Sequence, residues 1–288
     1  MASAFKRNGW TRVPVAAGMY YEPLLDMTAV IHGDDVLTEG EWEALDVLDQ
    51  QLMCEMDIKS LGRIGPDGIK YLKHTIKWTG RGCSWTGDGK HIAKAVEALG
   101  LQDATPAETP GTKATGRTMR DALDPLQGGG AKLFPSVAGL VNFVAVHRPD
   151  IQFALKVVLG DIAKPLEISM ASLKRIVRHL AGHPELEWVY DKQKMPKVVL
   201  YQTISDWADD EATRKSTSSV YCYFGKHLLE TQVASQAVVA LSRGAAAFFA
   251  LGPWPASTIL IMQVLQPRGI IVKPLVDAAP QARPALDT

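Results

Sequence analysis

The first hundred residues alternate between strand-like and helix-like hydrophobic patterns. Apolar runs at residues 27–31 and 36–38 flank a short polar turn, which predicts a strand, a tight turn and a second strand. Between residues 41 and 56 the apolar positions recur at intervals of three and four, which predicts a helix with one buried face. Residues 68–78 contain Ile, Tyr and Trp and predict a strand, and residues 88–99 predict an amphipathic helix.

The rest of the chain predicts a linker, a helical segment and a second sheet. A stretch with Pro, Thr and a Gly-Gly-Gly run, but few apolar residues, predicts the linker. Helical patterns follow at residues 132–146, 149–160 and 165–182, then strands around 198–205, 218–224 and 227–233, and a small-residue helix near 238–251. The predicted division is a first part at 1–105, a linker at 106–131, a helical segment at 132–190, an α/β domain at 197–279 and a disordered tail at 280–288.

Composition narrows the class of protein without naming a partner. Among 288 residues, 47% are hydrophobic and 22% charged, which excludes a fibrous or wholly disordered protein. The 31 basic and 31 acidic side chains cancel, so any binding to nucleic acid needs a local patch. Three scattered cysteines without a CxxC pair argue against a disulfide framework or a zinc site. With neither a signal-peptide pattern nor an unbroken apolar run, we expect a soluble, cytoplasmic or nuclear protein without a membrane partner.

Asp34 and Asp35 stand together at the tip of the first predicted hairpin. Two adjacent carboxylates on a tight turn can hold a divalent metal and reach a triphosphate, as two-metal phosphoryl transfer requires. Aspartate is also a favoured turn residue for backbone reasons. Taken alone, the pair therefore predicts a turn more readily than a catalytic site.

Several collinear segments resemble one family. They are VIHGDDVL at 30–37, TPGTKATG at 109–116, LFPSVAGLVNFVAVHRPDIQFAL at 133–155, KRIVRHLAGHPELEWVY at 174–190, SDWADDEATRKSTSSVYCYFG at 205–225 and VALSRGAAAFFAL at 239–251. In this order and at this spacing they resemble the Pol polyprotein of copia-type retrotransposons, and they cover most of residues 20–251.

The resemblance implies an α+β protein made of two parts. The first is a partial reverse transcriptase palm, with the Asp-Asp hairpin, followed by thumb or connection helices. The second is an α/β RNase H-like domain at residues 197–279. The resemblance further implies Mg²⁺ as cofactor and, as partner, an RNA or DNA template-primer or an RNA:DNA hybrid.

In the polymerase part, Asp34 and Asp35 match the metal-binding pair of the family's hairpin. The family's third polymerase carboxylate lies in an upstream motif that has no counterpart in this chain. Because two-metal chemistry needs the complete ligand set, we expect the chain alone to synthesise no DNA.

In the RNase H part, the resemblance places apolar residues where the family carries carboxylates. The first aspartate falls on Ile204 and the glutamate on Ala245, while Asp277 is a candidate for the third carboxylate. Apolar side chains cannot ligate magnesium, so this domain is expected to be inactive, and restoring both carboxylates is expected to rebuild a site. Asp206, Asp209 and Asp210 lie close by in sequence and are interpreted as residues of a solvated loop.

Lys174, Arg175 and Arg178 share one side of the predicted helix at 165–182. Spacing alone is equally compatible with a solvated helix surface and with a face that follows a phosphate backbone. The resemblance favours contact with nucleic acid, because thumb and connection segments lie along the template-primer duplex. The first hypothesis is thus a degenerate, inactive Pol fragment. Its rivals are a non-enzymatic nucleic-acid-binding remnant retained by a host and a pseudogene product.

Overall fold

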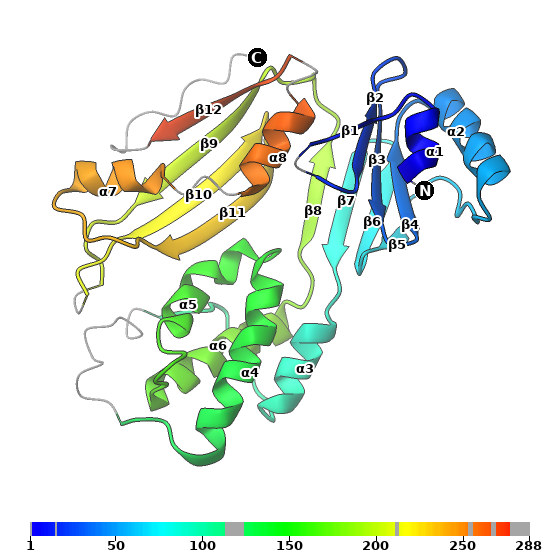
Figure 1. Cartoon of the computed structure of the whole chain (residues 1–288). Helices are drawn as coiled ribbons and strands as arrows, with labels where there is room; N and C mark the ends of the chain where they lie inside the picture. Colours follow the sequence, from blue (N-terminus) through cyan, green and yellow to red (C-terminus); the bar gives the residue numbers. More distant parts are fainter. Residues whose placement is uncertain are drawn as a thin grey trace. The chain divides into compact units, whose positions relative to one another are not determined.

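The computed structural model describes residues 2–14, 16–112, 124–210, 213–252, 256–265 and 269–276, and Figure 1 labels their elements. The chain divides into two compact units, Met1–Arg81 with Trp254–Ile271 and Gly82–Pro253 with Val272–Thr288. Each unit combines helices with antiparallel strand pairs, as the α+β prediction expected at this coarse level.

A four-stranded antiparallel sheet in the order β1-β2-β3-β4 organises the first unit. Its strands are β1 (Thr11–Arg12), β2 (Met19–Glu22), β3 (Met27–His32) and β4 (Asp35–Glu39). The unit also contains α1 (Ala2–Arg7), α2 (Trp42–Glu55) and α8 (Ala256–Leu265). Phe5 of α1 and Leu48 of α2 join Tyr20 and Met27 of the sheet in one buried cluster. The predicted hairpin and the predicted helix at 41–56 are confirmed.

Residues 69–79 form a hairpin, so the single strand predicted at 68–78 is wrong. The strands are β5 (Ile69–Tyr71) and β6 (His74–Thr79), and Tyr71 pairs with His74. Between them Leu72 and Lys73 adopt φ values of 46° and 66°, in the left-handed region that tight hairpin turns require. Neither residue is Gly or Asn, the residues that usually mark such a turn, so the turn could not be predicted from the sequence.

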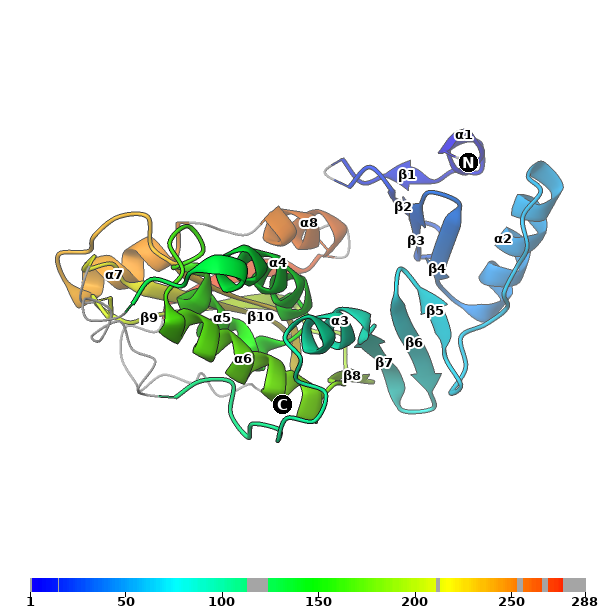
Figure 2. The ribbon, with the colours of Figure 1, turned by 90° about the horizontal axis from the view of Figure 1, so that it is seen from below.

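Four helices of the second unit pack together, as Figures 1 and 2 show. They are α3 (Lys90–Ala98), α4 (Gly128–Ala145), α5 (Pro149–Leu159) and α6 (Glu167–Gly182). Phe134, Ile151 and Leu173, from three of these helices, are completely buried in a shared core. The helical prediction for this region is confirmed.

Helix α4 begins at Gly128, inside the range predicted as linker. The preceding residues are held in place: Leu126 donates its backbone N–H to the Pro165 carbonyl, and Glu167 donates to the Asp124 carbonyl. The Leu126 side chain lies against Gly130, where a Cβ atom would come within 3.1 Å of it. These contacts fix the start of the helix despite the low helix propensity of glycine.

The strands β7 (Gly82–Gly87) and β8 (Glu187–Asp191) pair antiparallel across a long stretch of sequence. Trp85 stacks on Trp188 with ring centroids 5.5 Å apart. Strand β8 falls inside the segment predicted as helical, so that prediction is wrong for these residues. The strand was missed because its pairing partner is distant in sequence, and a local pattern cannot reveal such a pairing.

A second sheet has the strand order β11-β10-β9-β12. Its strands are β9 (Val198–Ser205), β10 (Thr217–Phe224), β11 (His227–Ser235) and β12 (Ile271–Val276), and α7 (Arg243–Ala250) follows β11. Helix α5 contacts β11 and the start of β10. Gln152 donates to the Thr231 carbonyl of β11 at 3.1 Å, and Lys156 donates to Thr217 Oγ1 of β10 at 2.6 Å. Within the described ranges no helix is long and apolar enough to cross a membrane.

Candidate functional site

Asp34 and Asp35 occupy the tip of the β3–β4 hairpin, where both are exposed. Asp35 pairs with His32 across the turn, and Gly33 adopts a φ of 60° that favours glycine. Tyr71 lies near this tip and donates its hydroxyl to the Val30 carbonyl at 3.2 Å. Burial, together with the negative charge of Asp35, raises the pKa of Tyr71.

These two carboxylates do not by themselves make a metal centre. Among the residues that the structure describes, no group of three or more His, Cys, Asp or Glu side chains could hold a metal ion. A two-metal site needs further oxygen ligands to hold both ions. Mg²⁺ therefore remains an expectation from the resemblance, and no catalytic step follows from the described geometry.

Ile204 and Ala245, the two apolar residues at positions where the resemblance led us to expect carboxylates, are associated with different faces of the second sheet. Ile204 pairs with Ser219 of β10, and its side chain is 41% exposed. Gln236 donates both to Ser218 Oγ at 2.9 Å and to the Ala246 carbonyl at 2.7 Å, so α7 packs on the face that carries Ser218. Because side chains alternate along a strand, Ile204 points to the opposite face. The expectation that restored carboxylates would share one site is not supported by this register.

The remaining predicted carboxylates divide into different environments. Asp210 is only 3% exposed, and its carboxylate accepts the Thr213 backbone N–H at 3.2 Å and the Thr213 hydroxyl at 2.5 Å. The solvated-loop interpretation is therefore wrong for this residue, although a Thr three positions after an Asp is a local signal for such a turn. Asp206 accepts the Thr217 N–H, and its pKa is raised by burial and by the nearby Asp209. Asp277 lies outside the described residues.

Helix α6 carries the predicted basic face. Lys174 is exposed, whereas Arg175 and Arg178 are half-buried because they contact the segment at residues 105–109. Arg175 donates through Nε to the Thr109 carbonyl at 3.0 Å and through Nη2 to Thr109 Oγ1 at 2.9 Å. Arg178 donates through Nε to the Thr105 carbonyl at 2.6 Å. The three predicted residues thus share a face, as expected, but two of them also hold a neighbouring piece of the chain.

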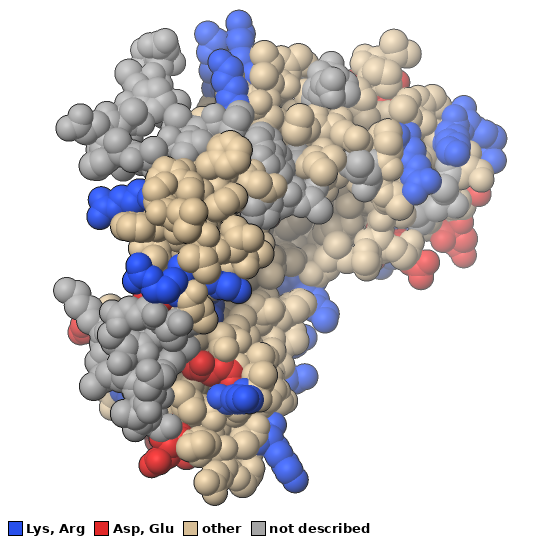
Figure 3. Space-filling model, turned by 60° about the vertical axis from the view of Figure 1, so that its left-hand side comes forward, with Lys and Arg blue, Asp and Glu red and all other residues tan. Residues whose placement is uncertain are grey.

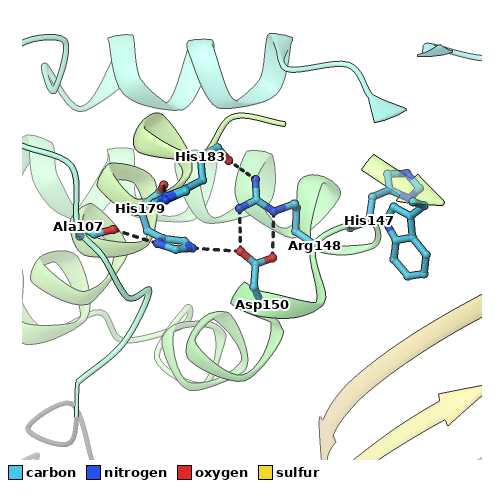
Figure 4. A network of polar contacts seen from close by, with 7 residues as sticks. Ala107, His147, Arg148, Asp150, His179 and His183 are labelled. Atoms are coloured by element: carbon cyan, nitrogen blue, oxygen red, sulfur yellow. Dashed lines mark hydrogen bonds and ion pairs between the residues drawn. The ribbon is translucent and has the colours of Figure 1, made fainter. Parts of the chain in front are cut away.

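A polar network adjoins this face and is drawn in Figure 4. Arg148, 5% exposed, donates to both carboxylate oxygens of Asp150 at 2.9 and 2.7 Å and to the His183 carbonyl at 2.6 Å. His179 is 3.1 Å from Asp150 through Nε2 and 2.9 Å from the Ala107 carbonyl through Nδ1. Burial raises the pKa of Asp150, but the bonds from Arg148 and His179 outweigh it and leave that pKa below its usual value.

Charge is dispersed on the face shown in Figure 3. The Lys and Arg side chains stand there in separate groups, and Asp and Glu side chains lie among them. This agrees with the zero net charge of the sequence. Any contact with phosphates therefore depends on a small local set of side chains such as those of α6.

Comparison with known proteins places these features in a family context. No protein-family model matches the chain. A retrovirus-related Pol polyprotein from the Nicotiana tabacum transposon TNT 1-94 is 26% identical over 84% of the chain. A second one, from the Arabidopsis thaliana transposon RE1, is 31% identical over 33% of the chain. The chain is a relative of transposon Pol polyproteins.

The chain spans only part of those Pol polyproteins. The aligned regions make up 18% of the tobacco Pol polyprotein and 6% of the Arabidopsis one. An uncharacterized mitochondrial protein of Arabidopsis thaliana is 25% identical over 75% of the chain, and this alignment covers 86% of that protein. A solved structure of a foamy viral protease-reverse transcriptase in complex with dsDNA aligns with 85% of this chain. The alignment covers 45% of the viral chain, with 14% sequence identity and a TM-score of 0.44.

The sequence does not show the role of the residues in this network. Arg148 and Asp150 belong to the segment that resembles the family, yet their contacts are structural: they join the start of α5 to the end of α6. His179 joins the network from α6. Its two acceptors come from α5 and from the 105–109 segment, so no local spacing reveals them.

Proposed function

We propose that the chain is a segment of a retroelement Pol polyprotein, from the reverse transcriptase and RNase H region, that binds duplex nucleic acid without catalysing its synthesis or cleavage. The observation that carries the first part is the alignment of 84% of the chain with a transposon Pol polyprotein. Those relatives are matched over less than a fifth of their length, so their activity does not transfer directly.

Nucleic acid binding is assigned to one side of α6. Lys174 is exposed there, and Arg175 and Arg178 present guanidinium groups beside it. Arginine and lysine supply most phosphate contacts in nucleic-acid complexes, and such contacts carry no sequence preference. The proposal is therefore binding to the backbone of a duplex, of which a template-primer and an RNA:DNA hybrid are the expected forms.

Catalytic inactivity is proposed from the residues that stand at the expected positions. Ile204 and Ala245 supply no oxygen ligands, and Asp34 with Asp35 lacks a third carboxylate among the described residues. A metal-dependent phosphoryl transfer loses its clamp when such ligands are missing. Mg²⁺ should consequently have little effect on the protein.

A second candidate is a host-retained remnant that acts outside a Pol polyprotein. It is favoured by the alignment with the Arabidopsis mitochondrial protein, which is matched over 86% of its own length. This candidate shares the proposed binding surface and differs in its biological setting. Finding the chain as a separate product in cells, rather than within a longer Pol polyprotein, would favour it.

The binding proposal is tested by salt-dependent affinity. Fluorescence anisotropy with a labelled duplex would be measured over a range of salt concentrations for the parent and for Lys174→Gln. The slope of log K against log salt should fall by about 0.9 for the lost B-DNA contact. Lys194→Gln, an exposed lysine between β8 and β9, is the matched control and should leave the slope unchanged. Equal slopes for all three proteins would remove Lys174 from the binding surface.

The inactivity proposal has its own assay. Nucleotide incorporation on a primed template and cleavage of an RNA:DNA hybrid would be followed with Mg²⁺ and with Mn²⁺. We expect neither activity to exceed that of a variant with Asp34→Asn and Asp35→Asn. Incorporation by the parent that this variant lacks would show that the hairpin is catalytically competent.

A further inference from the structure

A piece of chain outside the helices and strands, residues 105–109, lies along α6 and is held there through alternate carbonyl groups. The carbonyls of Thr105, Ala107 and Thr109 accept from Arg178, His179 and Arg175 respectively. We call this piece the strap. Its three acceptors are spaced by two residues, and the chain bends at Glu108 and Thr109.

The middle of the strap is anchored by packing as well as by hydrogen bonds. Ala107 is 5% exposed, and its backbone N–H donates to the Arg178 carbonyl at 3.4 Å. Pro106 lies directly over Gly182, the last residue of α6, where a Cβ atom would be 2.6 Å from the Pro106 Cβ. The close approach of the strap to the end of α6 thus depends on glycine at that position.

The strap fixes the orientation of both arginines. Its bonds engage Nε and Nη2 of Arg175 and Nε of Arg178. A guanidinium group carries five N–H donors in a rigid plane. Each arginine therefore keeps terminal N–H groups beyond those that bond to the strap. Arginine otherwise loses considerable rotamer freedom when it binds an anion.

We propose that the strap is a positioning element that orders Arg175 and Arg178 for phosphate contact before nucleic acid binds. The inference rests on the proposed function, since it concerns the same face of α6. Ordered donors bind an anion more tightly because the loss of side-chain freedom has already occurred in the unbound protein. The strap also carries Glu108, an exposed carboxylate, whose negative charge opposes phosphate binding and limits the affinity.

Gly182→Ala tests the strap because the added Cβ must displace Pro106. Gly139→Ala is the matched control: Gly139 is an exposed helical residue of α4, and a Cβ there meets no atom within 4 Å. In full-length protein shown to be folded by circular dichroism, Gly182→Ala should weaken duplex binding by about two- to tenfold for each arginine that must be ordered on binding. Gly139→Ala should bind as the parent does.

Thr109→Val provides a second readout that does not depend on the packing at Gly182. It removes the hydroxyl that accepts from Arg175 Nη2 and leaves the carbonyl bond in place. We expect a smaller loss of affinity, and the melting temperature should stay close to that of the parent because Thr109 is exposed.

The possible outcomes separate this inference from the proposed function. Weaker binding by both strap variants, with Gly139→Ala unchanged, supports positioning. Unchanged affinity would overturn the inference while the Lys174→Gln slope still supports the binding face. Tighter binding by Gly182→Ala would also overturn it, because the strap would then mask the arginines. A parent that binds no duplex would instead overturn the proposed function itself.

Discussion

His179 faces two acceptors at once: its Nε2 lies 3.1 Å from Asp150, and its Nδ1 lies 2.9 Å from the Ala107 carbonyl. A buried side chain that is 7% exposed therefore joins α5, α6 and the strap. We therefore expect this network to contribute to the free energy of unfolding.

We expect His179→Gln to keep one of these bonds and His179→Phe to keep neither. The loss should be about 1 to 3 kcal/mol in the free energy of unfolding, with Phe the more damaging because it leaves Asp150 and the carbonyl without this donor. Urea denaturation followed by circular dichroism measures it. His32→Gln, an exposed change at the hairpin tip, should leave the midpoint unaltered. Equal midpoints for all four proteins would show that the network contributes nothing.

Asp150 should link the stability of the fold to pH. Its pKa is lowered in the folded chain by Arg148 and His179 against the opposing effect of burial. A group whose pKa is lower in the folded state contributes stability that is present above its unfolded pKa and is lost as pH falls through the folded value. Asp150→Asn should therefore unfold more easily at neutral pH and show less additional loss on acidification. The urea midpoints of parent and variant should begin to converge as pH falls below about 4, the ordinary Asp value, and should meet only below the lowered pKa of the folded chain.

How far the sequence predicts the structure depends on whether the deciding contact is local. The β3–β4 hairpin and α2 follow from alternation and helical periodicity within a few residues, so both were predictable. The shared side of Arg175 and Arg178 was predictable for the same reason. Their acceptors were not, because Thr109 and Thr105 lie 66 and 73 residues away in sequence.

Asp210 should matter for the stability of the β9–β10 loop although it was expected to be solvated. Replacing it with Ala leaves the Thr213 N–H and hydroxyl without their acceptor and should cost about 1 to 3 kcal/mol. Asp209→Ala is the control, since Asp209 is exposed and differs by one position. In thermal unfolding, the melting temperature of Asp210→Ala should be clearly lower than that of Asp209→Ala. A similar melting temperature for both would restore the solvated-loop interpretation.

The three cysteines should differ in their reactivity toward a thiol reagent. Cys54 is exposed, Cys83 is half-buried and Cys222 is buried in β10. Burial raises the pKa of Cys222 to about 11, so very little thiolate, the reactive form, is present at neutral pH. Mass spectrometry after timed labelling should show modification of Cys54 first and of Cys222 only when the protein unfolds. Early labelling of Cys222 would contradict the position of β10 inside the sheet.

The register of the second sheet gives an expectation for restored carboxylates that differs from the one drawn from sequence. Ile204 lies on the face that carries Ser219, and α7, which contains Ala245, packs on the face that carries Ser218. A double change of Ile204→Asp and Ala245→Glu should therefore place the two carboxylates apart, and two-metal chemistry needs ligands that converge on the same ions. Because Ile204 is 41% exposed, its replacement by Asp should be tolerated without a large loss of stability.

We expect Mg²⁺ to leave the melting temperature of the double variant unchanged, since a ligand stabilises a fold only by binding it. The parent, each single variant and the double variant should all fail to cleave an RNA:DNA hybrid. A rise in melting temperature with Mg²⁺ that is confined to the double variant would show that the two positions do converge, and that the strand register or the placement of α7 differs from the one described.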